Sequence, residues 1–224
     1  MEESNNKNNN HVEETSKKIV VPGEFLGQTG KKRIGSHVFI KDNGMYSDVL
    51  GLLSEADDWI NIVPLEGKYD ARRDDIVIGV VASERFAGYD ININGFYPSF
   101  IPKSALRNPL RLGDIVSGIV DSVNEVNEIS LTNIRTFFDG EIIHVSPVKV
   151  PRMIGKNNSM LNVLKQGTLC QFVVGRNGMV WAKGGNIDLL VKALRKIEHE
   201  SHLSNLTNNI NEFLEEEKKK GELK

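Results

Sequence analysis

The feature of this sequence that points most directly to chemistry is a long stretch without acidic side chains. From Ile142 to Ile187 there is no Asp or Glu, yet cations recur throughout. These cations are Lys149, Arg152, Lys156, Lys165, Arg176 and Lys183. A solvated surface normally mixes both signs, so charge of one sign over this length creates a positive field that attracts polyanions. The pattern favours binding to a phosphate backbone. The alternatives are cations scattered over several faces and an acidic protein partner.

A second acid-free stretch, residues 91–113, combines cations with aromatic rings. The cations are Lys103, Arg107 and Arg111, and the rings are Phe96, Tyr97 and Phe100. Cations of this kind neutralise phosphates, while rings stack on bases. Phe96 and Phe100 are equally well explained as core residues, because aromatic side chains dominate small cores. We therefore predict phosphate contacts at the three cations and base stacking at Tyr97.

Other cations are weaker candidates for contacts with nucleic acid. Arg72, Arg73 and Arg85 are second choices, because Arg72 and Arg73 precede two aspartates and can pair with them locally. In the basic C-terminal stretch the weaker candidates are Arg152, Lys156 and Lys183.

Two glycine motifs could approach a phosphate through their backbones. Gly155-Lys-Asn-Asn158 precedes a predicted helix, whose N-terminus favours an anion, but it lacks the closing glycine of a G-x-x-G loop. An equally good interpretation is a turn in which Asn158 or Ser159 caps the helix. Gly175-Arg-Asn-Gly178 fits G-x-x-G, but strand-like runs flank it, so the Asn-Gly pair favours a β-hairpin.

Nothing in the sequence predicts catalysis, a metal or a cofactor. The single cysteine, Cys170, excludes an internal disulfide and a zinc site built from several cysteines. His199 and His202 are three residues apart on a predicted helix and lack a third ligand nearby. There is no apolar run long enough to cross a membrane and no secretory h-region, so we expect a cytoplasmic protein that does not contact membranes.

The 224 residues, 39% of them hydrophobic, allow several small domains. We expect a mainly β, multi-domain protein with a C-terminal α/β part. Residues 1–16 are polar and Asn-rich, which predicts a disordered tail. The expected parts are a β domain over 17–66, a five-stranded OB barrel over 67–136, a KH-like domain over 137–202, and a helix with a charged tail over 203–224.

Short β-type runs separated by turn residues define the first two domains. Asn43-Gly44 predicts a hairpin turn, because both residues accept positive φ. The barrel strands are expected at Ile76–Ser83, Tyr89–Ile93, Gly113–Val123 and Ile129–Leu131, a spacing typical of small barrels.

The C-terminal part alternates strand-like and helical patterns. Ile142–Val150 and Cys170–Ala182 are expected to be β structure. A helix is expected from Ser159 to Gln166, stopped by Gly167. A second helix is expected from Ile187 to Ile197, with Asn186 as its cap. Residues 203–220 predict a further amphipathic helix.

The order of several motifs carries a family resemblance. The motifs are Val21-Pro-Gly-Glu24, Phe100-Ile-Pro-Lys103, Ile129-Ser-Leu-Thr132 and Gly175-Arg-Asn-Gly178, together with Gly113-Asp-Ile-Val inside the S1-type OB barrel. With them, residues 17–200 resemble the KH-containing RNA-binding cap subunit of the archaeal exosome.

The resemblance implies a non-catalytic subunit that binds single-stranded RNA and feeds its 3′ end to a nuclease. In that family three cap subunits, all alike or mixed with the other cap subunit, sit on a hexameric ring of RNase-PH-like subunits. The resemblance also implies that Gly175, Asn177 and Gly178 are structural rather than RNA contacts. The rival hypothesis is a protein-docking scaffold in a ribonucleoprotein complex, whose basic stretch meets an acidic subunit.

Overall fold

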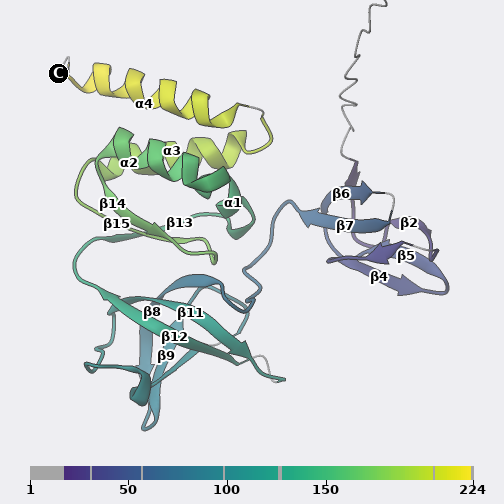
Figure 1. Cartoon of the computed structure of the whole chain (residues 1–224), viewed down its shortest axis with the longest axis horizontal. Coiled ribbons are helices and arrows are strands. Elements are labelled where there is room, and N and C mark those ends of the chain that lie inside the picture. The colour runs from purple at the N-terminus through teal and green to yellow at the C-terminus, as the bar shows by residue number, and fades with distance from the viewer. Residues whose placement is uncertain are drawn as a thin grey trace, which may run out of the picture. The chain divides into compact units, whose positions relative to one another are not determined.

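The computed structural model describes residues 18–222, apart from residues 31, 57, 98, 126, 127 and 204. The chain separates into two compact units, with the boundary between Glu66 and Gly67 (Figure 1). Each unit is described by itself. The tail expected over residues 1–16 lies outside the described residues.

The first unit consists of two small sheets. One has the strand order β1 (Ile19–Val20), β6 (Gly51–Ala56), β7 (Trp59–Pro64) and β3 (Arg33–Ile34). The other has the order β2 (Phe25–Gln28), β5 (Gly44–Ser47) and β4 (Val38–Lys41).

The hairpin of β4 and β5 forms where it was expected, but its turn is shifted by one residue. Lys41 pairs with Gly44, so the two turn residues are Asp42 and Asn43, with φ of 47° and 62°. Gly44 instead begins β5. Asp tolerates the left-handed region well enough to take the first turn position.

The second unit begins with a closed five-stranded barrel, which confirms the expected architecture. Its order is β10-β12-β11-β8-β9. The strands are β8 (Ile76–Glu84), β9 (Gly88–Asn92), β10 (Ser99–Pro102), β11 (Ile115–Val123) and β12 (Ile129–Phe137). Strand β10 was missing from the sequence prediction, and β12 is longer than predicted. Alternate apolar side chains of these strands fill the interior, for example Val77, Ile91, Ile101, Val120 and Leu131.

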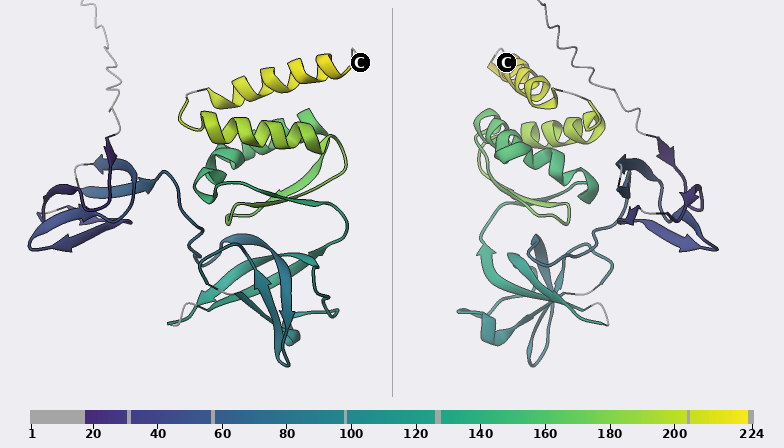
Figure 2. Two further views of the ribbon diagram at one scale, coloured as in Figure 1. Left: turned by 180° about the vertical axis from the view of Figure 1, so that it is seen from behind. Right: turned by 45° about the vertical axis from the view of Figure 1, so that its right-hand side comes forward.

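The α/β part follows the barrel in the same unit. Its sheet has the order β13 (Glu141–His144), β15 (Met179–Lys183) and β14 (Gln171–Val174). The helices are α1 (Val150–Ile154), α2 (Ser159–Thr168), α3 (Ile187–Glu200) and α4 (Leu206–Glu222), and short 3-10 turns cover Pro147–Lys149 and Lys156–Asn158. Both views in Figure 2 show α2 and α3 on one face of the sheet and α4 beyond them.

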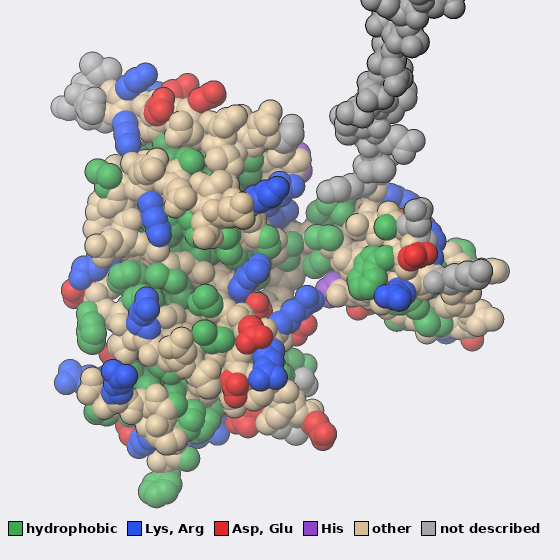
Figure 3. Space-filling model, in the orientation of Figure 1, with side chains coloured by type: hydrophobic (Ala, Val, Ile, Leu, Met, Phe, Trp, Pro, Cys, Tyr) green, Lys and Arg blue, Asp and Glu red, His purple; other side chains and the backbone are tan. Residues whose placement is uncertain are grey.

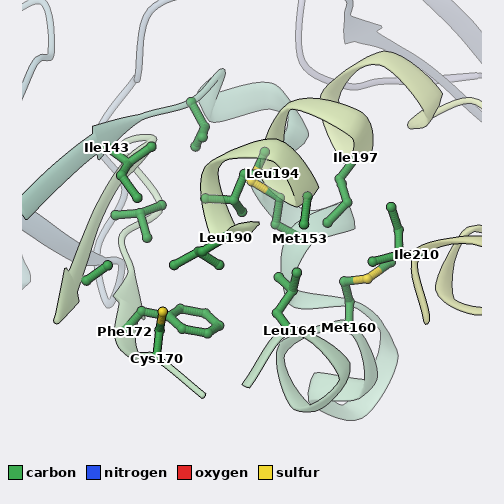
Figure 4. Close-up of a cluster of buried hydrophobic side chains, with 14 of the residues drawn as sticks. Ile143, Met153, Met160, Leu164, Cys170, Phe172, Leu190, Leu194, Ile197 and Ile210 are labelled. Carbon is green, nitrogen blue, oxygen red and sulfur yellow. The ribbon is translucent and has the colours of Figure 1, made fainter. Parts of the chain in front are cut away.

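The α/β sheet is buried on both faces, as period-2 alternation along its strands allows. On the helix side, Ile143, Val180 and Ala182 join the core drawn in Figure 4. On the barrel side, Met179 and Trp181 pack with Ile78 of the barrel. The ring of Trp181 also stacks on Phe137 at 4.3 Å between centroids.

Two local predictions in the α/β part were wrong. The run Ile142–Val150 was expected to be entirely β, but β13 ends at His144, a 3-10 turn covers Pro147–Lys149 and α1 begins at Val150. Gly167 was expected to stop α2, but it lies inside the helix, where the Leu214 side chain of α4 comes within 2.5 Å of the place a Cβ would occupy. Gly167 therefore serves close packing, and α2 ends at Thr168, with Leu169 as its left-handed C-cap at φ 57°. The Asn186 cap is confirmed, because its Oδ1 accepts the Leu189 N–H at 2.9 Å.

Gly88, the first residue of β9, provides a test of the barrel packing. A Cβ there would lie 2.2 Å from the Ile101 carbonyl oxygen and 2.4 Å from the Phe100 ring. Gly88→Ala is expected to lower the free energy of unfolding by about 2 kcal/mol, because the neighbouring strand must move. At Gly95 the nearest atom to an added Cβ is 3.6 Å away. Gly95→Ala is therefore the control, expected within about 0.5 kcal/mol of the parent in urea denaturation. Equal stability of the two variants would contradict this packing.

Candidate nucleic-acid interface

The ladder of β9 and β10 divides the functional candidates of the barrel into two groups. Pro102 pairs with Gly88 at one end of the ladder, and Ser99 pairs with Ile91 at the other. We call residues 84–88 and 103–114 the cationic end. We call residues 68–75, 93–97 and 175–178 the junction end, because it meets the α/β part.

Lys103 lies at the cationic end, where its charge is partly matched. Its N–H donates to the Ala87 carbonyl at 3.0 Å, and its Nζ lies 2.7 Å from Glu84 Oε1. The hydrogen bond to Glu84 raises the pKa of Lys103 above its usual value. The same Nζ lies 5.7 Å from the centroid of the Tyr89 ring. Lys103 can still meet a phosphate, but it must share its charge with Glu84.

Arg107 and Arg111 are more available to a ligand than Lys103, because no acidic side chain is paired with them among the described residues. Both are exposed, and neither guanidinium forms an ion pair within the part of the chain that the structure describes. The backbone around them is fixed, since the Arg111 N–H donates to Asp114 Oδ2 at 2.8 Å and the Leu110 N–H donates to the Tyr89 hydroxyl at 3.3 Å. A fixed backbone with free guanidinium groups suits phosphate recognition.

Arg85 is held by an acid and is the weakest cation of the group. Its Nε lies 2.7 Å from Asp90 Oδ2, which also accepts the Ser83 hydroxyl. Desolvation acts to raise the pKa of Asp90, but the hydrogen bonds from Ser83 and Arg85 outweigh it and lower that pKa.

Phe86 is a candidate that the sequence analysis missed. It occupies the β8–β9 loop at the cationic end, and its side chain is fully exposed. A fully exposed ring beside cations offers a face for base stacking, and in OB barrels the loop between the first two strands commonly contacts nucleic acid. The signal was present in Arg85-Phe-Ala87, a ring in a short turn between two predicted strands.

Tyr97 does not lie beside the three cations that share its acid-free stretch. It is exposed, but it precedes β10 and so lies at the junction end, across the β9–β10 ladder from Lys103. Its neighbour there is Phe96, 61% exposed, at 6.4 Å between ring centroids. Lys68 Nζ lies 5.5 Å from the Phe96 centroid. Tyr97 and Lys103 are only six residues apart in the sequence, but strand β10 lies between them and separates the two side chains.

The Gly175–Gly178 hairpin joins the α/β part to the barrel through the side chain of Asn177. Asn177 is fully buried; its Oδ1 accepts the Ile78 N–H at 3.1 Å, and its Nδ2 donates to the carbonyls of Ile78 at 2.6 Å and Ile93 at 2.7 Å. Gly175 and Gly178 leave no room for a Cβ, which would meet Asn177 Oδ1 at 2.3 Å and the Val145 carbonyl at 2.2 Å respectively. Gly175, Asn177 and Gly178 are therefore buried in contacts within the protein and are not exposed to a ligand.

The remaining predicted cations lie in different settings. Arg72 and Arg73 are exposed, and the local pairing that was considered for them is absent among the described residues, since Asp75 instead accepts the Tyr69 hydroxyl at 2.8 Å and lies 3.9 Å from Arg176. Lys183 Nζ lies 2.9 Å from Asp139 Oδ2, and this contact lowers the pKa of Asp139.

Arg152 in α1 and Lys156 in the following turn are both exposed, without an ion pair to any described residue. The turn itself has left-handed Asn157 and Asn158, with φ of 52° and 62°. The capping role considered for Asn158 or Ser159 is not observed, because α2 begins without a side-chain cap hydrogen bond.

The described residues contain no group of three or more His, Cys, Asp or Glu side chains that could hold a metal ion. None of the helices described is long and apolar enough to span a membrane.

Comparisons of this chain with protein families and with known proteins identify its relatives. Residues 17–66 match the family model described as "Exosome RNA binding protein RRP4 N-terminal domain", and residues 140–188 match the KH domain. The exosome complex component Rrp4 of Methanosarcina mazei is 37% identical over 219 residues, covering 91% of this chain and 84% of the relative. Rrp4 of Thermococcus kodakarensis is 34% identical, covering 88% and 85%. The chain belongs to the archaeal Rrp4 family.

One solved relative supports the same Rrp4 architecture. It is a crystal structure assigned as an exosome complex RNA-binding protein, 28% identical, with a TM-score of 0.62 over 68% of this chain and 98% of that one. The resemblance drawn from the motifs is thereby confirmed. Of those motifs, Gly175-Arg-Asn-Gly178 has the clearest structural basis. The side chain of its Asn177 forms the hydrogen bonds that join the α/β part to the barrel.

Proposed function

We propose that this chain is a non-catalytic cap subunit of the archaeal exosome that binds single-stranded RNA and delivers its 3′ end to a ring of phosphorolytic nuclease subunits. The relatives named as exosome complex components and the solved relative assigned to RNA binding support this proposal. Three copies, alone or mixed with the other cap subunit, would surround the entrance of the ring, in the cytoplasm.

The observation that carries RNA binding is the pair of unmatched guanidinium groups at the cationic end. Arg107 and Arg111 can each fork onto a phosphate, Lys103 adds a partly matched charge, and Phe86 offers a free ring to a base. These contacts are made to the sugar-phosphate backbone and to the flat face of a base, which all nucleotides share. Binding should therefore tolerate different sequences and weaken with salt.

The first unit supports attachment to a protein ring. Its surface carries many large apolar side chains for so small a unit, including Ile19, Val21, Phe25, Phe39, Ile40, Trp59 and Val63. Exposed apolar side chains at this density mark protein-interaction surfaces. Docking through this unit would use residues other than those proposed to bind RNA in the second unit.

Reconstitution tests the proposal as a whole. The purified chain is incubated with 3′-labelled RNA and phosphate, alone and with the nuclease ring from the same organism. The chain alone is expected to leave the RNA intact. Added to the ring, it is expected to lower the RNA concentration needed for half-maximal degradation.

Two outcomes would contradict the proposal. Shortening of RNA by the chain alone would make it an enzyme. Tight association with the ring, combined with no RNA binding and no effect on degradation, would favour the scaffold hypothesis, in which the basic stretch meets an acidic subunit.

A further inference from the structure

The tip of the Gly175–Gly178 hairpin presents Arg176, a cation that lies outside the cationic end of the barrel. Arg176 lies between two residues with structural roles, and its own N–H donates to the Ile76 carbonyl at 2.8 Å. Asn177 anchors the hairpin to both β8 and the residue after β9. The backbone of Arg176 is therefore fixed at the boundary of the barrel and the α/β part.

The guanidinium of Arg176 remains largely available. Its nearest acid is Asp75, and the Nε to Oδ1 distance of 3.9 Å is too long for a hydrogen bond. The other oxygen of Asp75 is occupied by the Tyr69 hydroxyl, and burial together with this contact raises the pKa of Tyr69. About half of the Arg176 side chain is exposed, so its donors can reach a ligand.

Further cations continue from Arg176 onto the α/β part. The Gly178 carbonyl accepts the Val145 N–H at 2.8 Å, so the hairpin lies against the segment that leads into α1. Along the chain this segment is followed by Arg152 of α1 and Lys156 of the next turn, both exposed and without an ion pair to any described residue. Figure 3 shows Lys and Arg side chains over α1 and at the boundary with the barrel, with Asp and Glu side chains beside them on the barrel side.

Acidic side chains are sparse on the α/β side of Arg176, whereas Asp70 and Asp74 are exposed on its barrel side. The chain has no Asp or Glu from Ile142 to Ile187. Glu198 reaches the segment, but it accepts the Ser146 N–H at 2.6 Å and is paired with Arg195 at 2.7 Å. On the barrel side of Arg176, the exposed rings of Phe96 and Tyr97 follow Ile93, whose carbonyl is bound by Asn177.

We infer that single-stranded RNA continues across the boundary between barrel and α/β part, along a junction track formed by Phe96, Tyr97, Arg176, Arg152 and Lys156. The rings stack on bases, and the three cations bind successive phosphates. The exposed rings of Phe96 and Tyr97 distinguish this track from a surface for an acidic peptide, which would need the cations alone. The inference rests on the proposed function and extends the RNA path beyond the cationic end.

The test compares two lengths of RNA on the full chain. Fluorescence anisotropy measures the affinity for labelled single strands of about 5 and about 16 nucleotides, the range that one OB fold covers. Arg176→Ala is expected to weaken binding of the longer RNA about threefold and to reduce the slope of log affinity against log salt by about 0.7, the effect of one phosphate contact. The short RNA, which the cationic end can hold by itself, is expected to bind as before.

Lys219 is the matched control, an exposed cation of α4 for which no ion pair is found among the described residues. Lys219→Ala is expected to leave both affinities unchanged. Arg176→Lys keeps the charge and is expected to restore most of the affinity, even if the alanine variant is less stable.

The outcomes separate this inference from the proposed function. If Arg176→Ala matches Lys219→Ala on the longer RNA, or weakens both lengths equally, the junction track is wrong while RNA binding stands. If the parent chain binds neither RNA, the proposed function itself fails.

Discussion

Asn177→Ala is expected to lower the free energy of unfolding of the second unit by about 3–5 kcal/mol, because three buried backbone groups lose their partner. The Ile78 N–H and the carbonyls of Ile78 and Ile93 all bond to this one amide. The site is fully buried, so water cannot replace the amide without opening the boundary between barrel and α/β part. Urea denaturation followed by circular dichroism measures the change.

Two further variants make the Asn177 prediction specific. Asn177→Asp has the same shape but loses both N–H donors and places a carboxylate against two carbonyls, so it should destabilise at least as much as alanine. Asn208→Ala, at an exposed position in α4, should change the stability by less than about 0.5 kcal/mol. If Asn177→Ala unfolds at the same urea concentration as Asn208→Ala, the hairpin does not hold the two parts together.

Charge reversal at the cationic end is the second change with a large expected effect. Replacing Lys103, Arg107 and Arg111 with Glu is expected to weaken single-stranded RNA binding on the order of 100-fold, since phosphate contacts are lost and repulsion is added. The three cations lie on one connection between β10 and β11, whose backbone is fixed by Asp114 and the Tyr89 hydroxyl. Fluorescence anisotropy at constant salt measures the loss.

A charge-matched control shows whether position or net charge matters. Arg33, Lys41 and Lys219 are exposed, and none forms an ion pair within the described ranges. Their triple replacement with Glu changes the net charge equally and should weaken RNA binding less than about threefold. Equal losses in both triple variants would mean that the chain attracts RNA by its overall charge, without a site at the cationic end.

Local sequence patterns predicted most of the fold, and the misses have physical causes. The barrel strands were recognisable because turn residues separate β-type runs, but β10 has only four residues and ends at Pro102. Helix α1 was hidden because β-branched residues continue from the true strand β13 as far as Val150, although the strand itself ends at His144. Gly167 was predicted to end the helix because glycine commonly does so. Its actual role depends on Leu214, which is distant in the sequence and packs against it.

The candidate site was less predictable, because its properties depend on contacts between distant residues. The cations of residues 103–111 were identified from their local sequence. The partners that weaken two candidates, Glu84 for Lys103 and Asp90 for Arg85, come from the pairing of β8, β9 and β10. Exposure of Phe86 and the separation of Tyr97 from Lys103 follow from the same strand register, which composition does not reveal.

The salt dependence of RNA binding by the intact chain tests the central claim most directly. Dissociation constants for one single-stranded RNA of about 16 nucleotides are measured over a series of salt concentrations. Four or more phosphate contacts predict a slope of about −3 in log association constant against log salt. A slope near zero, or no measurable binding at low salt, would contradict the account, since the guanidinium groups of this barrel would then not hold an RNA backbone.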